Sequence, residues 1–178
     1  MKQEHKQKRA REIVGVVVDF ANLKMIESTQ QVEGLFSKFA SGRFKVIPPD
    51  EKHIQAYKQD QAKLRERLTL IAENPDAAKK NLSKDLKKFI NEKVHASVYF
   101  EGGTIQYDYT VDGVEAALAL GLAFVLDRNY KVGHLKQCAN PDCGKFLPNL
   151  DIRARPRNTC NARCKAKADA YRKKLARQ

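Results

Sequence analysis

Tryptophan is absent from this chain of 178 residues, and cysteine is absent before position 138. No apolar run approaches the roughly 20 residues that a membrane-spanning helix needs. The apolar stretch IVGVVV follows the polar segment MKQEHKQKRARE and is too short for the core of a secretory signal. We therefore expect a cytoplasmic protein, in which thiols stay reduced.

Patterns typical of catalysis are also lacking. The N-terminal part shows no phosphate-binding loop, no pair of carboxylates and no arrangement of His, Cys and Ser suited to covalent catalysis. Asp19, Asn22 and Asp108 are the polar residues there with apolar surroundings, and Asp19 and Asn22 serve equally well as helix caps. We expect no enzyme, and we keep Asp19 and Asn22 as candidate residues of a small-ligand pocket.

Acidic residues are scarce at both ends of the chain. The formal net charge is +13, of which residues 1–11 carry +4 and residues 138–178 carry +8, so that the part between them is nearly neutral. A near-neutral body with two basic ends indicates contact with a polyanion at those ends. The alternative is a solubility tail with no partner.

The apolar pattern predicts mainly helices. The β-branched residues 13–23 favour a buried strand, with helix entry near Asp19 or Asn22 as an equal alternative. Helical spacing predicts helices over residues 50–72 and 75–94. Residues 95–111 alternate with a period of two around a Gly-Gly pair, which is typical of a β-hairpin. The following segment DGVEAALALGLAFVLDRN is apolar on nearly all sides and predicts a central, buried helix.

The four cysteines form two close pairs, Cys138-x4-Cys143 and Cys160-x3-Cys164. Two such pairs separated by a loop favour a tetrahedral Zn²⁺ site with four thiolate ligands. With no open coordination position, the site is structural and not hydrolytic. The alternatives are an iron–sulfur cluster, which also takes four thiolates, two disulfides, and replacement of one ligand by His134.

A basic helix is expected after the second cysteine pair. If a helix begins near Asn158 or Thr159, both thiols of that pair lie on one face, and an apolar seam continues through Ala168, Tyr171 and Leu175. Arginine forks on this surface suit phosphates or guanine edges, so we predict nucleic-acid binding, to DNA before RNA. The candidate contact residues are Arg153, Arg155, Arg157, Arg163, Lys165, Lys167, Arg172, Lys173 and Lys174.

These segments together resemble a known family over roughly residues 13–175. The segment CANPDCGKFL and the later cysteine pair with its basic helix are similar to the CGNR zinc finger, and VVVDFANL is similar to an early LDxxNT-type segment of the same proteins. The resemblance implies an N-terminal domain of the ABATE type, a stress-linked sensing module, joined to a nucleic-acid-binding zinc finger. It also implies a bacterial transcription regulator.

The sequence departs from the family pattern at the name-giving motif. Cys-Gly-Asn-Arg is replaced by Cys164-Lys165-Ala166-Lys167, the second pair is one residue tighter, and Thr159 and Leu23 stand where the family has an aromatic residue and Thr. Lysine keeps the charge of arginine but loses its bidentate fork. Phosphate contact is therefore better supported than base-specific reading.

The predicted fold class is mainly α with a small β component (α+β). A basic tail (residues 1–12) precedes an ABATE-like helical domain with a β-hairpin (residues 13–133), which senses a ligand or mediates dimerisation. A small treble-clef-like zinc-binding module ending in a basic helix follows (residues 134–178). The expected partners are Zn²⁺, nucleic acid, a small-molecule effector and a second copy of the chain, with no membrane. An RNA-binding protein with a purely structural zinc site, or a small-ligand-binding protein, is the alternative function.

Overall fold

The computed structural model describes residues 2–36, 54–101, 104–111, 113–126, 135–148 and 157–177. This part of the chain is mostly helical and contains two antiparallel sheets of two strands each, which confirms the predicted mainly α fold with a small β component. None of its helices has both the length and the apolarity required to cross a lipid bilayer. The elements are α1 (Lys2–Asn22), α2 (Thr29–Phe36), α3 (Ile54–Glu73), α4 (Pro75–Lys93), β1 (Val94–Glu101), β2 (Thr104–Val111), α5 (Gly113–Leu126), β3 (Lys136–Gln137), β4 (Phe146–Leu147) and α6 (Ala162–Leu175).

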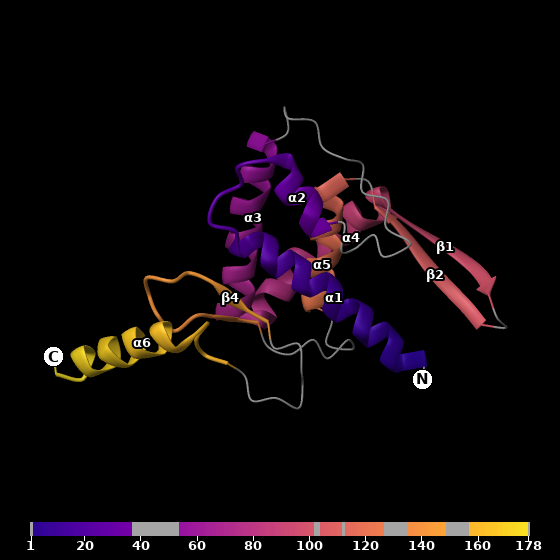
Figure 1. Cartoon of the computed structure of the whole chain (residues 1–178). Coiled ribbons are helices and arrows are strands. Elements are labelled where there is room, and N and C mark those ends of the chain that lie inside the picture. Colours follow the sequence, from indigo (N-terminus) through magenta and orange to yellow (C-terminus); the bar gives the residue numbers. More distant parts are fainter. Residues whose placement is uncertain are drawn as a thin grey trace.

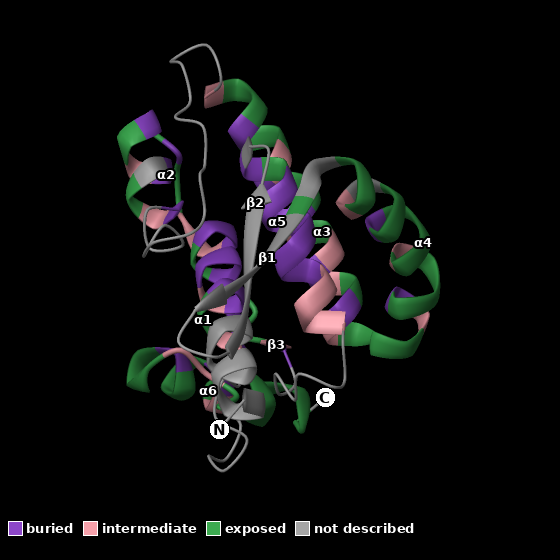
Figure 2. Cartoon of the chain, turned by 90° about the vertical axis from the view of Figure 1, so that its right-hand side faces the viewer, coloured by how far each residue is buried: buried purple, intermediate pink, exposed green. Residues whose placement is uncertain are grey.

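The α5 helix lies at the centre of the helical body, as its all-round apolar sequence predicts. It contacts α1, α3 and α4, and most of its residues are buried (Figure 2). At the crossing of α1 and α5, a Cβ atom on Gly121 would overlap the side chain of Val17. Glycine at position 121 therefore lets these two helices approach closely.

Residues 13–22 belong to α1, so the strand favoured by their β-branched side chains does not form. The alternative of helix entry near Asp19 or Asn22 is also wrong, because the helix begins at Lys2 and ends at Asn22. Val14, Val17 and Val18 are buried in the helical core. β-propensity largely reflects packing on a pleated surface, and this segment packs on helices instead.

The other predicted elements are confirmed where the structure describes them. α3 buries Tyr57, Leu64, Leu68 and Ile71 on one face, and α4 begins with Pro75 in its first turn. β1 and β2 pair in register from Val94↔Val111 to Glu101↔Thr104. The Gly-Gly turn lies outside the described residues.

The C-terminal module lies at one end of the helical body. Its two short strands β3 and β4 pair with each other, contacting α3 and α1 respectively. The helix α6 points away from the body, on the side opposite to the β1–β2 hairpin (Figure 1). This arrangement leaves most of α6 surrounded by solvent, since Cys164 and Ala168 are its only buried residues.

Candidate metal centre

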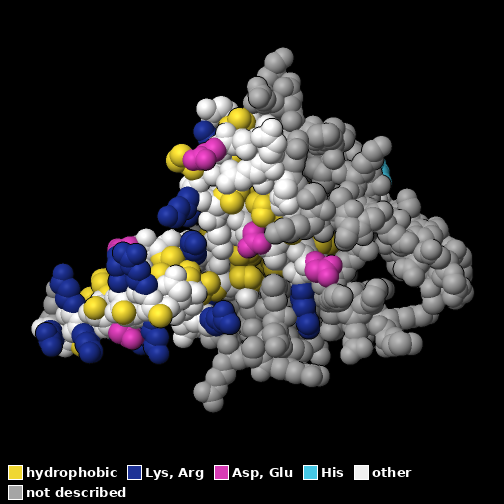
Figure 3. All heavy atoms as spheres, viewed as in Figure 1, with side chains coloured by type: hydrophobic (Ala, Val, Ile, Leu, Met, Phe, Trp, Pro, Cys, Tyr) yellow, Lys and Arg dark blue, Asp and Glu magenta, His cyan; other side chains and the backbone are white. Residues whose placement is uncertain are grey.

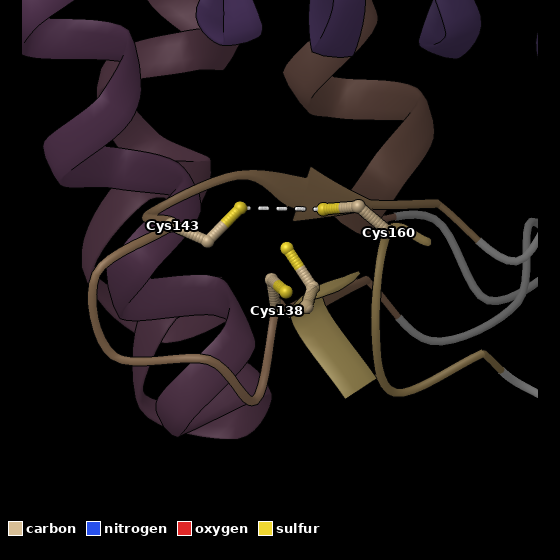
Figure 4. Close-up of side chains that lie close together, drawn as sticks. Cys138, Cys143 and Cys160 are labelled. Carbon is tan, nitrogen blue, oxygen red and sulfur yellow. Dashed lines mark hydrogen bonds between the residues drawn. The ribbon is translucent and has the colours of Figure 1, made fainter. Parts of the chain in front are cut away.

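Four thiols meet where the β3–β4 hairpin faces the start of α6. The Sγ atoms of Cys138, Cys143, Cys160 and Cys164 all lie within 4.8 Å of one another. The Sγ atoms of Cys143 and Cys160 are 3.4 Å apart, and both side chains turn towards the same centre as that of Cys138 (Figure 4). Four thiolates that bind one metal at about 2.3 Å in a tetrahedron lie about 3.8 Å from each other. The cluster therefore has the size and the donor set to hold one metal ion.

A tight turn between β3 and β4 positions the first cysteine pair. The backbone N–H of Cys138 donates to the carbonyl of Lys145 (2.8 Å), and the N–H of Cys143 donates to the carbonyl of Asn140 (3.0 Å). Gly144 closes the turn with a φ of 60°, a left-handed conformation that glycine adopts without steric cost. The sequence CANPDCGK thus folds so that both thiols point to the same side.

The start of α6 positions the second cysteine pair. Asn161 is the N-cap, and its side chain accepts a hydrogen bond from the backbone N–H of Cys164 (2.9 Å). The helix therefore begins after Cys160, later than the predicted start near Asn158 or Thr159. Cys164 lies in the first helical turn.

The thiols of the cluster shift one another's pKa values. Burial raises the pKa of Cys138, but backbone groups of Asn140 and Cys160 and neighbouring thiols lower it to about 7. Burial and the thiols of Cys143 and Cys138 raise the pKa of Cys160. The Asn140 amide lowers the pKa of Cys164, yet burial and the same neighbours raise it overall. Confined thiolates repel one another, so a bound cation is what would allow all four to ionise.

Asn140 connects the two halves of the cluster. Its side chain is buried, and its amide nitrogen donates to the Sγ of Cys164 at 3.6 Å while its amide oxygen accepts from the backbone N–H of Asp142. Hydrogen bonds to ligand sulfurs tune and orient a metal site. The exposed ion pair of Lys167 with Asp142 (3.1 Å) links α6 to the same turn.

Asn22 attaches this module to the helical body. Its amide nitrogen donates to the carbonyl of Phe146 (2.9 Å), and its amide oxygen accepts from the N–H of Phe146 (2.8 Å). The ring of Phe146 is buried in the core. Asn22 was predicted as a residue of a ligand pocket, but its amide is occupied by the β4 backbone, and Asp19 of the same prediction is exposed. We call the paired hydrogen bonds of Asn22 and Phe146 the joint.

Two residues of α3 support the joint from the other side. The side chain of Gln61 donates to the carbonyls of Phe20 and Leu23 at 2.8 and 3.0 Å, and so closes the end of α1. The guanidinium of Arg65 lies beside Gly144. A Cβ atom added at position 144 would be 3.5 Å from its nitrogen. The module therefore rests on both α1 and α3.

The predicted nucleic-acid-binding residues lie along α6 and just before it. Two of them have acidic partners among the described residues: Lys167 pairs with Asp142, and Arg172 pairs with Asp169 at 2.7 Å. Arg153, Arg155 and His134 lie outside the described residues. The residues that the structure describes are all exposed: Arg157, Arg163, Lys165, Lys167, Arg172, Lys173 and Lys174.

No protein-family model matches this chain, and no curated protein sequence is similar to it. The resemblance to the CGNR and ABATE proteins stays a prediction from the quoted motifs. What the geometry establishes is a four-thiol cluster at the base of an exposed basic helix.

Sequence reasoning missed two asparagines of this site, Asn140 and Asn161, and assigned a third, Asn22, to a ligand pocket. Asn161 directly precedes a helix, and asparagine at that position is a common N-cap, so its role could have been read from the sequence. Asn140 lies between two predicted ligands, but its hydrogen bond to the Sγ of Cys164 joins residues 24 positions apart. Asn22 was noticed as a polar residue at the end of an apolar run, but its partner is 124 positions away.

Proposed function

We propose that the four cysteines bind one Zn²⁺ ion and that the chain is a nucleic-acid-binding protein whose contact surface is α6. Four thiolates without an open position are the ligand set of structural zinc sites. A knuckle between two short strands, followed by a helix with one cysteine just before it and one in its first turn, supports the treble-clef-like module expected from the sequence. The zinc ion would neutralise the clustered thiolates and hold the helix in place.

The anchoring of α6 supports the role of the metal. A helix of 14 residues is marginally stable in water without tertiary contacts. Only Cys164 and Ala168 of α6 are buried, and both lie in its first half. Metal binding would therefore supply much of the free energy that keeps α6 folded and oriented.

The observation that carries the nucleic-acid assignment is the charge of this anchored helix. Residues 162–175 contain six Lys or Arg and one Asp. Exposed cations on a fixed helix can follow a row of phosphates and release their counterions, which drives binding. The resemblance to CGNR proteins extends the proposal to DNA and to transcription regulation in the cytoplasm, with the helical domain in sensing or dimerisation.

The metal assignment is tested by elemental analysis of the protein purified under reducing conditions without added zinc. One zinc per chain supports the proposal. The double variant Cys143→Ser/Cys160→Ser should then contain no bound zinc. Iron with visible absorbance would instead indicate an iron–sulfur cluster. Absence of bound metal with four free thiols and an intact α6 would contradict the proposal.

Nucleic-acid binding is tested with a charge-matched pair of triple variants. The first replaces Lys165, Lys173 and Lys174 by Gln, and the second replaces the exposed Lys80, Lys84 and Lys87 of α4 by Gln. The two variants have the same net charge, so only the position of the change differs. We expect the α6 variant to lower the affinity for a 20-base-pair DNA and to reduce the slope of log K against log salt by up to about 3. Equal behaviour of both variants would refute α6 as the contact surface.

A further inference from the structure

The apolar seam of α6 continues beyond the part of the helix that is packed. Cys164 and Ala168 are buried, but the next two members of the seam, Tyr171 and Leu175, are 46% and 52% exposed. They are two of the four large hydrophobic side chains that are exposed in the described part of the chain. The other two, Met25 and Leu70, lie on separate segments. An aromatic ring thus lies open to solvent on the helix proposed to bind nucleic acid.

Lysine and arginine side chains flank this ring. Lys167 precedes Tyr171 by four residues and Lys174 follows it by three, so both are neighbours on the helix surface. Among the described residues Lys174 has no acidic partner, whereas Lys167 and Arg172 are paired with Asp142 and Asp169. Figure 3 shows hydrophobic side chains along α6 with Lys and Arg side chains on either side.

We propose that α6 binds single-stranded nucleic acid, with an unpaired base stacked on Tyr171 and the adjoining phosphate on Lys174. The inference rests on the proposed function and names its substrate class. Proteins that bind single strands combine a cationic track with aromatic rings on which bases stack. In a duplex the base faces are covered by their neighbours, so Tyr171 finds no face to stack on. Leu175, one turn further along, extends the apolar surface for the edge of the same base or the next one.

A second copy of the chain fits this surface less well. The excess of five positive charges on α6 would repel an identical helix. An aromatic side chain buries at most about 150–250 Å², so Tyr171 and Leu175 together remain well below the roughly 800 Å² per partner of a standard interface. A polyanion that carries aromatic rings satisfies both the charge and the apolar seam.

The experiment compares Tyr171→Ala and Tyr171→Phe on three labelled probes of equal length: oligo(dT), oligo(rU) and a mixed-sequence DNA duplex. Alanine removes the ring and has higher helix propensity than tyrosine, so α6 is not weakened, and metal content and circular dichroism verify this. We expect Tyr171→Ala to weaken binding of the single strands about 10-fold and of the duplex less than 2-fold. Tyr171→Phe should stay within 2-fold of the wild type on every probe. The oligo(dT) and oligo(rU) arms show whether the strand is DNA or RNA.

The outcomes separate this inference from the proposed function. If the Lys165/Lys173/Lys174→Gln variant loses affinity while Tyr171→Ala keeps full affinity for both single strands, the stacking inference is overturned and the proposed function stands. Equal loss on single strand and duplex would also overturn it. If the charge variant binds every probe like the wild type, the proposed function itself fails. Poly-L-glutamate of equal charge serves as a competitor of oligo(dT). If it displaces oligo(dT) from the wild type but not from Tyr171→Ala, the result would point to an acidic protein partner and overturn the inference.

Discussion

Replacing Asn22 by alanine tests how the cysteine module is held on the helical body. The substitution removes both hydrogen bonds of the joint, at 2.9 and 2.8 Å, and leaves the backbone N–H and C=O of Phe146 without this partner. Each such bond contributes about 1 kcal/mol net, and an unsatisfied, partly buried group adds to the loss. We expect the free energy of unfolding to fall by about 2–3 kcal/mol. At about 2–4 °C per kcal/mol for a chain of this size, Tm should fall by roughly 5–10 °C.

The assay is thermal unfolding followed by far-UV circular dichroism, with zinc at saturation. The matched control is Asn81→Ala, which changes an exposed asparagine on α4 and should alter stability by less than about 0.5 kcal/mol. Asn22→Asp keeps an acceptor for the Phe146 N–H and loses the donor to its carbonyl, so its Tm should lie between those of the wild type and Asn22→Ala.

The metal content of Asn22→Ala should remain that of the wild type, because the four cysteines are untouched. A Tm of Asn22→Ala equal to that of Asn81→Ala would refute the reasoning, since the joint would then contribute nothing measurable to stability. Loss of bound metal in Asn22→Ala would show that the joint shapes the cluster itself, and the calculation from two hydrogen bonds would be wrong.

Three further substitutions test the packing, the turn and one carboxylate. Gly121→Ala places a Cβ atom against Val17 and should lower the free energy of unfolding by about 1–3 kcal/mol in urea titrations; the double variant with Val17→Ala should recover part of this loss. Gly144→Ala forces a left-handed φ on a residue with a Cβ atom and should destabilise the turn by about 1–2 kcal/mol. Because this turn positions Cys138 and Cys143, the variant should release its metal at a lower chelator concentration than the wild type. Burial and then the charge of Glu115 raise the pKa of Asp60 above 3.8, so ionisation of Asp60 opposes folding and its cost appears as pH rises through the raised value. Asp60→Asn should therefore raise Tm at pH 7 and leave it unchanged near pH 3.

Much of the fold could be predicted because its signals are local. The period of 3.6 in α3 and α4, the period of two in β1 and β2, and the uniform apolarity of α5 each reflect which face is buried. The cysteine cluster could be predicted for a similar reason. Within each pair the two cysteines are close in sequence, so each pair can bring two thiols to one metal site. These patterns depend on neighbours in the sequence.

The segment 13–22 and the roles of Asn22 and Gln61 could not be predicted, because they depend on residues distant in sequence. The segment 13–22 has strand propensity, but the partner that buries it is α5, a helix about 100 residues later. The role of Asn22 depends on Phe146, and that of Gln61 depends on the carbonyls at the end of α1. The propensity of a single residue does not depend on such distant partners. Tertiary packing therefore determines the structure at these positions.

The two residues of the joint are synthesised at very different times. At 5–20 residues per second, a separation of 124 positions means that about 6–25 s pass between synthesis of Asn22 and of Phe146. Helix formation and collapse take microseconds, so α1, α3, α4 and α5, all of which precede Phe146, have time to pack first. The cysteine module is made after these helices, so it can dock onto them once they have packed. If the cysteine cluster binds a metal, a shortage of that metal would leave the helical body folded and the cysteine module incomplete.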